Sequence, residues 1–127
     1  MAHFLSGVLD GDAPFSLRVE RTGAVLGDAL VLAGTSASRR QGLLGRDGLP
    51  PGGGLIIAPS QGIHTFGMRF PLDIICVTRE GAVIKVRTAV PPRRVVLSWA
   101  AFAIVEMASG EAERAGLAEG DRLEARR

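Results

Sequence analysis

Residues 61–75, Gln-Gly-Ile-His-Thr-Phe-Gly-Met-Arg-Phe-Pro-Leu-Asp-Ile-Ile, hold the side chains of this chain that are best suited to chemistry. His64 can gain or lose a proton near neutral pH, and Arg69 can hold a carboxylate or phosphate through two parallel hydrogen bonds. Asp73 opens a strongly apolar run, where a carboxylate needs a hydrogen-bond or charge partner. The segment is therefore the first candidate for a site.

A ligand-binding site is predicted near His64, Met68, Arg69, Asp73 and Glu106. Glu106 joins the set because it is an acid inside the apolar run Phe-Ala-Ile-Val-Glu-Met-Ala, where an unpaired charge is costly. A second interpretation stays open at this point. Asp73 and Glu106 could instead be structural, each bonded to backbone amides or to an internal arginine.

No catalytic residue, metal site or cofactor is predicted. No serine lies in a Gly-x-Ser-x-Gly elbow, and the glycines at 52–54 are not followed by the Lys-Ser or Lys-Thr of a phosphate loop. The other histidine, His3, is far from the candidate segment in the chain. A small hydrolase or metal-assisted enzyme that uses Asp73 or His64 is the alternative function, so the sequence does not decide whether the protein is an enzyme.

Length and composition favour one domain. With 127 residues, 46% of them hydrophobic, the chain can bury enough surface for one core, which we expect over 15–127 behind a flexible arm at 1–14. Cys76 is the single cysteine, which excludes an intrachain disulfide. The first residues do not resemble a signal peptide, and no apolar run is long enough to cross a membrane. We therefore expect a soluble, cytoplasmic protein without membrane contact.

The charge balance says little about partners. Fifteen basic and thirteen acidic residues leave a formal charge of +2, which is too small to indicate nucleic acid by itself. The arginine pairs at 39/40, 93/94 and 126/127 could form a basic face, so RNA or single-strand binding is a second alternative, although few aromatic residues are available for stacking. The partner is an unknown small molecule or protein, and the choice between monomer and homodimer is open.

Alternating apolar residues and frequent turn signals predict a mainly β fold (α+β by count). We expect a single compact, mostly antiparallel, barrel-like β domain with one or two short helices. Strands are expected at 15–20, the second half of 24–33, 55–58, 72–78, 82–88, 95–97, 102–108 and 122–125, helices at 36–45 and 111–115, and loops at 48–54 and 90–94.

Several short motifs resemble one family. They are Arg39, Gly42-Leu43-Leu44 and Arg46, then Met68-Arg69-Phe70-Pro71-Leu72-Asp73-Ile74, then Val105-Glu106-Met107, Gly110 and Gly120-Asp121. In order and spacing they resemble the bacterial and archaeal domain-of-unknown-function family 192, over about residues 28–125. The resemblance implies a small β-rich, barrel-like domain without an assigned activity.

Two positions depart from the pattern of that family. Many members carry Trp-Met-Lys-Asn-Thr where this chain has residues 64–68, and many have a second basic residue where it has Gln41. A role for His64 therefore does not carry over from the resemblance. The sequence as a whole favours a non-catalytic binding module for a small anionic ligand or peptide.

Overall fold

The structure is a computed structural model that describes residues 3–8 and 14–127, without the side chains of Arg40 and Gln41. The described residues form nine strands, two α-helices and one short 3-10 helix. In chain order these are η1 (Ser6–Val8), β1 (Phe15–Val19), β2 (Val25–Ala33), α1 (Ser36–Gln41), β3 (Gly53–Ile57), β4 (Gly62–His64), β5 (Leu72–Val77), β6 (Val83–Val90), β7 (Val95–Leu97), β8 (Ala103–Ala108), α2 (Glu111–Arg114) and β9 (Leu123–Arg126).

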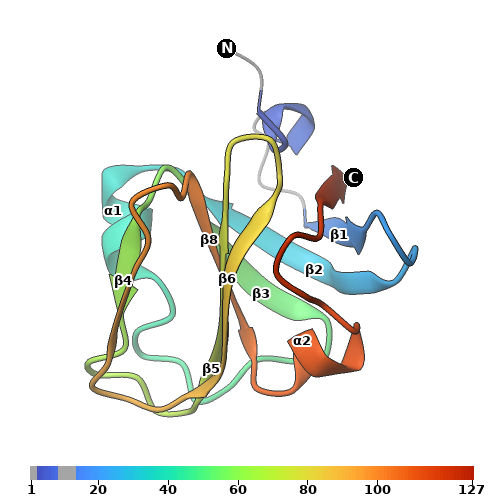
Figure 1. Ribbon diagram of the computed structural model, residues 1–127. Coiled ribbons are helices and arrows are strands. Elements are labelled where there is room, and N and C mark those ends of the chain that lie inside the picture. The colour runs from blue at the N-terminus through green and yellow to red at the C-terminus, as the bar shows by residue number, and fades with distance from the viewer. Residues whose placement is uncertain (1–2, 9–13) are drawn as a thin grey trace.

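Seven strands form one curled sheet in the order β6-β5-β8-β3-β2-β1-β9, while β4 and β7 form a separate pair (Figure 1). Among the described strands only β2 and β3 pair in parallel, because α1 lies in the connection between them. The two edges of the curl meet where Ala82 bridges to Arg122 and the Val83 amide donates to the Asp121 carbonyl at 2.7 Å. The predicted mainly β, barrel-like fold is confirmed as a half-barrel.

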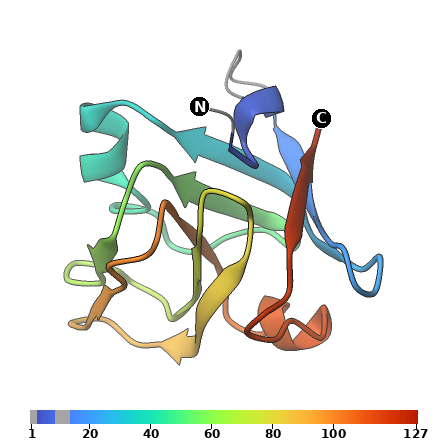
Figure 2. The same ribbon diagram turned by 45° about the horizontal axis from the view of Figure 1, so that its top comes forward.

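Each face of the sheet carries its own core. The enclosed core draws on both edges of the curl, and it includes Phe15, Leu17, Val19, Leu26, Leu30, Ile56, Ile75, Val105, Met107 and Leu123. The second core lies on the opposite face and includes Leu43, Leu55, Ile57, Met68, Leu72, Ile74, Val96 and Ile104. The segment after α1 and the β4–β7 pair cover this second face, and α1 and α2 lie at opposite ends of the sheet (Figure 2).

The prediction of a loop over 48–54 is wrong for its last two residues. Gly53 and Gly54 begin β3 and pair with Ala29 and Leu30 of β2. Their lack of a side chain is what permits this pairing. A Cβ on Gly54 would lie 2.6 Å from the Glu106 carbonyl oxygen, so only glycine lets β3 approach β8 this closely.

The helix expected at 36–45 is shorter, ending at Gln41. Its start is fixed by a capping box, in which the Thr35 hydroxyl accepts from the Ser38 amide and the Ser38 hydroxyl accepts from the Thr35 amide, both at 3.0 Å. Its end is fixed by Gly42, whose φ of 51° leaves the helical range. Leu43 and Leu44 are thereby turned out of the helix towards the second core.

Two further elements differ from expectation. β2 begins at Val25 rather than midway through 24–33, because its first residues already pair with β1, Arg18 opposite Val25. The strand β4 was not predicted, since its three residues carry no alternation long enough to recognise.

The segment 1–14, expected to be a flexible arm, contributes to the core in its described part. Leu5 and Val8 are buried, and the Phe4 amide donates to the Arg79 carbonyl at 2.8 Å. The turn η1 places these two side chains three residues apart, so both point into the enclosed core. Residues 9–13 of the arm lie outside the described residues.

Candidate functional site

A cavity of about 310 Å³ opens on the second face of the sheet, between that face, the segment after α1 and strand β4. Three of the five sequence-predicted site residues line it, namely His64, Met68 and Glu106. The other two, Arg69 and Asp73, do not. The complete lining is Arg39, Gly42, Leu43, Leu44, Ile57, Ser60, Gly62, Ile63, His64, Met68 and Glu106.

Glu106 is the buried charged group of the cavity. Its residue is only 5% exposed, and within the described chain its carboxyl makes no hydrogen bond and no ion pair. Burial raises the pKa of Glu106 to about 7, because the charged form loses solvation. A raised pKa favours the protonated carboxyl, which can donate as well as accept a hydrogen bond.

Strand register explains why this acid lacks a partner. Glu106 lies on β8 between Leu55 of β3 and Ile74 of β5, so both cross-strand neighbours are apolar. Its chain neighbours Val105 and Met107 point to the other face, into the enclosed core. The cavity is therefore the one direction in which the Glu106 carboxyl can meet a polar group. The floor of the cavity combines this acid with the apolar side chains of the sheet.

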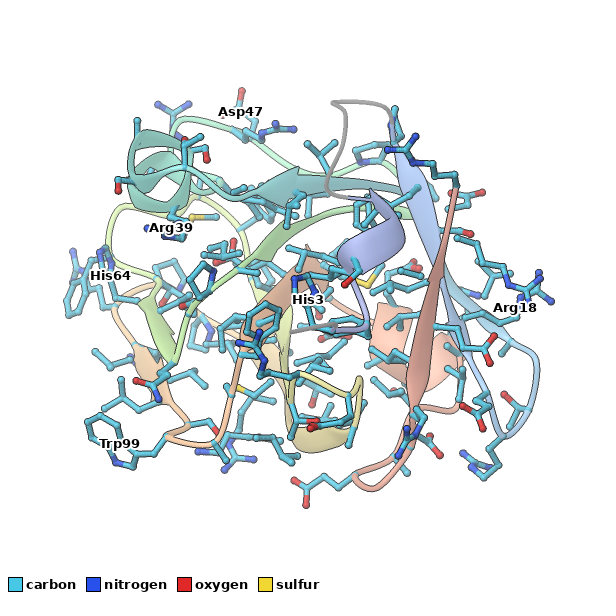
Figure 3. The ribbon with its side chains drawn as sticks, turned by 90° about the horizontal axis from the view of Figure 1, so that it is seen from above. His3, Arg18, Arg39, Asp47, His64 and Trp99 are labelled. Carbon is cyan, nitrogen blue, oxygen red and sulfur yellow. The ribbon has the colours of Figure 1, made fainter. Side chains whose placement is uncertain are left out.

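Arg39 lies at the opposite wall of the cavity from the sheet, on the capped helix α1 (Figure 3). Its guanidinium donates to the Gly34 carbonyl at 2.5 Å and, more weakly, to the Ser36 hydroxyl at 3.4 Å. A guanidinium has five N–H donors, so further donors stay available for an anion. No ion pair joins Arg39 to Glu106 in the described part of the chain.

His64 and Ser60 supply polar groups along the strand that borders the cavity. His64 is exposed, and its ring lies 5.8 Å from the Phe66 ring. The Ser60 hydroxyl donates to the Gly62 carbonyl at 2.9 Å, which holds the start of β4 in place. Figure 3 shows His64 at the same end of the molecule as Arg39. The cavity thus has an acidic floor and a basic and polar rim.

Met68 and Arg69 are chain neighbours with different surroundings. Met68 is buried and forms part of the apolar wall. Arg69 points to solvent and pairs with Asp47 at 2.7 Å, and both side chains are largely exposed. An exposed pair of this kind contributes little to stability.

Asp73 is buried on the opposite face of the sheet from Glu106, and its carboxylate is fully engaged. One oxygen accepts from the Ala89 amide at 2.9 Å, and the other accepts from the Gly110 and Ala112 amides at 3.1 and 2.9 Å. These bonds tie β5 to the end of β6 and to the start of α2. The geometry matches the structural interpretation of this residue, in which backbone amides satisfy the acid.

Other chemistry finds little support in the described residues. Nowhere in residues 3–8 and 14–127 do three or more His, Cys, Asp or Glu side chains gather as a metal site would require. Burial raises the pKa of the Cys76 thiol, which keeps it protonated and poorly nucleophilic. The described arginines of the three pairs are on separate elements: Arg39 on α1, Arg93 and Arg94 before β7, and Arg126 on β9. Nor does the described chain hold a helix of the length and apolarity that a bilayer crossing needs.

Sequence reasoning overlooked Arg39 and Ser60 as cavity residues. The sequence placed Arg39 only in a surface arginine pair and in a family motif, because nothing local shows that a helix turns it towards β8. A signal was nevertheless present. Six of the eleven cavity residues belong to the motifs that carry the family resemblance, namely Arg39, Gly42, Leu43, Leu44, Met68 and Glu106.

The fold and the cavity define a class: a small half-barrel β domain with a polar-floored cavity on its outer face. The chain belongs to the family DUF192, described as an uncharacterized ACR, and the family model matches residues 18–125. This confirms the resemblance drawn from the motifs. No curated protein matches the chain significantly.

Two solved structures share the fold. One is a protein of unknown function from Novosphingobium aromaticivorans DSM 12444, 26% identical, with a TM-score of 0.75 over 87% of this chain and 83% of the other. The second, from Sinorhizobium meliloti 1021, is described provisionally as a transcription regulator. It is 22% identical, with a TM-score of 0.75 over 91% of this chain and 98% of the other.

Proposed function

We propose that this protein is a non-catalytic binding domain whose cavity takes one small organic ligand. The ligand would carry an anionic group towards Arg39, a hydrogen-bond donor towards Glu106, and an apolar body between them. One observation carries the proposal: the Glu106 carboxyl is buried, faces a cavity, and has no partner within the described residues. Buried charges are normally paired, so a bound donor is the natural complement.

The size and lining of the cavity restrict the ligand. A volume of about 310 Å³ is at the lower end for ligand pockets, which suits a molecule about the size of an amino acid. Leu43, Ile57, Ile63 and Met68 offer an apolar wall, so a purely polar ion such as free phosphate would leave most of the cavity unmatched. A ligand with both charges at its ends and an apolar middle matches all three zones.

A second candidate function is supported by the same acid. A carboxyl with a pKa of about 7 is suited to act as a general base at neutral pH. Besides His64, the nucleophile among the lining residues is Ser60, whose hydroxyl is bonded to the Gly62 carbonyl. We therefore favour binding, and a ligand recovered chemically unchanged after long incubation would separate binding from turnover.

The proposal is tested with 5-aminopentanoate, 6-aminohexanoate and 7-aminoheptanoate, amino acids in which a methylene chain separates the two charged ends, and with their N-acetyl and carboxamide forms, titrated by calorimetry. We expect the free amino acids to bind, and each blocked form to lose at least about tenfold in affinity, because one charged end is removed. Affinity should rise up to about tenfold from pH 6 to 8, since an ammonium prefers the ionised form of an acid whose pKa is about 7.

Matched variants locate the binding. Glu106→Gln should weaken the binding of the free amino acids and of their carboxamides but not that of the N-acetyl forms. Arg39→Gln should weaken the binding of the free amino acids and of the N-acetyl forms but not that of the carboxamides. Glu113→Gln and Arg46→Gln, both at exposed positions outside the cavity, serve as controls. Absence of binding by every compound, or equal binding by Glu106→Gln and the wild type, would contradict the proposal.

A further inference from the structure

The outward face of the β4–β7 pair is unusually apolar for a solvent-facing surface. Four of the six large hydrophobic side chains that are exposed in the described residues belong to it: Phe66 at 51%, Val95 at 58%, Leu97 at 53% and Trp99 at 81%. Figure 3 shows Trp99 at the rim of the molecule, on the same side as His64. We call these four residues the apolar face. Clustered exposed hydrophobic residues mark interaction sites more often than scattered ones do.

Strand alternation shows that the apolar face is additional to the core. In the β4–β7 ladder, Ile63 and Val96 pair with each other and pack on the second core. Val95 and Leu97 are the alternate positions, which point outward and would be expected to be polar in a pair that covers a core. The fold therefore does not need apolar side chains at these two positions.

The apolar face contains a hollow rather than a single protruding tip. Its volume is about 390 Å³, and its lining is Gln61, Gly62, Ile63, His64, Val95, Leu97 and Trp99. Gly62 makes room for it, because a Cβ there would lie 2.4 Å from the Leu97 Cδ2 atom. A hollow of this kind can receive one or two side chains of another molecule.

The segment that contains the apolar face is basic. Residues 61–105 carry six basic side chains, Arg69, Arg79, Lys85, Arg87, Arg93 and Arg94, against the two acids Asp73 and Glu80, which is a formal charge of +4, and Arg69 pairs with Asp47, an acid outside the segment. The whole chain carries only +2, so the remaining residues sum to −2. Asp73 is buried and bonded to backbone amides, so it does not offset the positive charge at the surface. Lys85 lies directly beside β7, where its ammonium donates to the Leu97 carbonyl at 2.5 Å.

We propose that the apolar face is a docking surface for an acidic segment of a partner protein that carries apolar side chains. The hollow accepts an apolar side chain next to Trp99, and Lys85, Arg93 and Arg94 attract the acidic residues of the segment. Trp and Arg are the residue types that dominate binding energy in protein interfaces. A second copy of this chain is a poor occupant, because two basic faces would repel each other.

The docking surface and the ligand cavity share one wall. Gly62, Ile63 and His64 line both the cavity and the hollow, on the two sides of β4. A segment bound over Trp99 and Leu97 would therefore reach the strand that borders the cavity. The docking proposal does not depend on the ligand, since Glu106 and Arg39 are not part of the apolar face.

The test uses three fluorescein-labelled peptides of about twelve residues, and fluorescence anisotropy measures the affinity of the protein for each of them. One alternates glutamate with leucine and phenylalanine, one replaces each glutamate with lysine, and one replaces each apolar residue with serine. We expect the first to bind at least about tenfold more tightly than either of the others. Added salt should weaken it, because exposed charges are screened.

Matched variants assign the binding to the apolar face. Leu97→Ser combined with Trp99→Ser should reduce the affinity at least about tenfold, whereas Val25→Ser combined with Val31→Ser, two exposed residues of β2, should leave it unchanged. Arg93→Ser combined with Arg94→Ser should weaken binding and flatten its salt dependence, and Arg122→Ser combined with Arg127→Ser is the control. Thermal denaturation confirms that each variant is folded.

Three results would overturn the proposal. The first is equal binding of the three peptides, or binding that survives the Leu97 and Trp99 substitutions. The second is sedimentation with vesicles of phosphatidylcholine and phosphatidylglycerol that requires Trp99, without peptide binding, which would assign the face to a lipid surface. The third is a dimer in analytical ultracentrifugation that Trp99→Ser dissociates. The variant Glu106→Gln should still bind the acidic peptide, so failure of the ligand proposal does not imply failure of this one.

Discussion

Asp73 and Glu106 are two buried carboxylates on neighbouring strands, and their surroundings are opposite. Asp73 accepts three backbone hydrogen bonds on one face of the sheet. Glu106, one register step away on the other face, faces a cavity and makes no hydrogen bond within the described residues. The same feature in the sequence, an acid within an apolar strand, therefore holds loops in one case and leaves a carboxyl without a described protein partner, facing a cavity, in the other.

The difference arises from what lies beyond each strand. Asp73 lies at the start of β5. The end of β6 and the residue before α2 bring the amides of Ala89 and Gly110 within hydrogen-bond distance of its carboxylate. Glu106 lies in the interior of β8, where the neighbouring strands use their amides for the ladder and offer only apolar side chains. A buried acid at a strand end can thus be satisfied by turns, while one in mid-strand depends on a side chain or a ligand.

The largest effect on stability is expected from removing Asp73, the acid whose carboxylate accepts three hydrogen bonds. Asp73→Ala should lower the free energy of unfolding by about 3–5 kcal/mol, because three amides, the buried Ala112 amide among them, would lose the carboxylate that accepts from them. Asp73→Asn should cost less, since one oxygen remains to accept. Urea denaturation at neutral pH measures both. A loss below about 1 kcal/mol for Asp73→Ala would show that these bonds do not hold the loops.

Removing the charge of Glu106, the acid without a described protein partner, should have the opposite effect on stability. Because burial raises the pKa of Glu106 to about 7, the folded state binds its proton more tightly than the unfolded state, and stability falls as pH rises from about 4.5 to 7. Glu106→Gln removes this loss, so the variant should exceed the wild type by up to about 3 kcal/mol at pH 8 and match it near pH 4. Urea denaturation across this pH range gives the difference. A Gln variant that is less stable than the wild type at pH 8 would mean that the carboxylate has a partner.

Asp121 is a third buried acid, and the pH dependence of its contribution to stability extends the comparison. The Arg21 guanidinium, at 2.6 Å, lowers the pKa of Asp121 from its usual value, and the Ala118 amide adds to this at 2.9 Å. A lowered pKa contributes stability that is present at neutral pH and lost as pH falls through the folded-state value. Asp121→Asn should therefore cost about 1–2 kcal/mol at pH 7 and much less at pH 3. A cost that does not change between these two pH values would contradict a charge-based role.

The smallest effect is expected at Arg69. Its ion pair with Asp47 is exposed on both sides, so Arg69→Ala should change the free energy of unfolding by less than about 0.5 kcal/mol. Affinity for cavity ligands should not change, because the side chain does not line the cavity. Thermal denaturation and calorimetry measure the two quantities. A loss of ligand affinity in Arg69→Ala would move the site towards the exposed loop.

Much of the fold was predictable because its signals are local. Alternation identified most strands, and the turn signals between them include Gly81 and Gly116, which both adopt positive φ. The pairing of Gly53 and Gly54 was not predictable, because it depends on the close approach of β8, which only the folded chain reveals. The burial of Leu5 and Val8 was missed for the same reason, since their partners lie in distant strands.

The candidate site was predictable only in part. His64, Met68 and Glu106 line one cavity, whereas Arg69 and Asp73, which are close to His64 and Met68 in sequence, lie elsewhere in space. Sequence proximity to the polar segment placed Arg69 in the set, although the bend before β5 leaves its side chain exposed to solvent. The sequence could not separate Asp73 from Glu106, because the amides that satisfy one and the cavity that faces the other belong to remote segments.

The titration of Glu106 tests the central claim most directly. The side-chain carboxyl carbon, followed by ¹³C NMR as pH is varied, should shift with a pKa of about 7, and Glu113, which is exposed, provides a reference signal in the same sample. Such a value would establish a buried acid without a partner in the ligand-free protein. A pKa near the ordinary value of 4.5 would mean that Glu106 is solvated or paired, and the binding proposal would lose its basis.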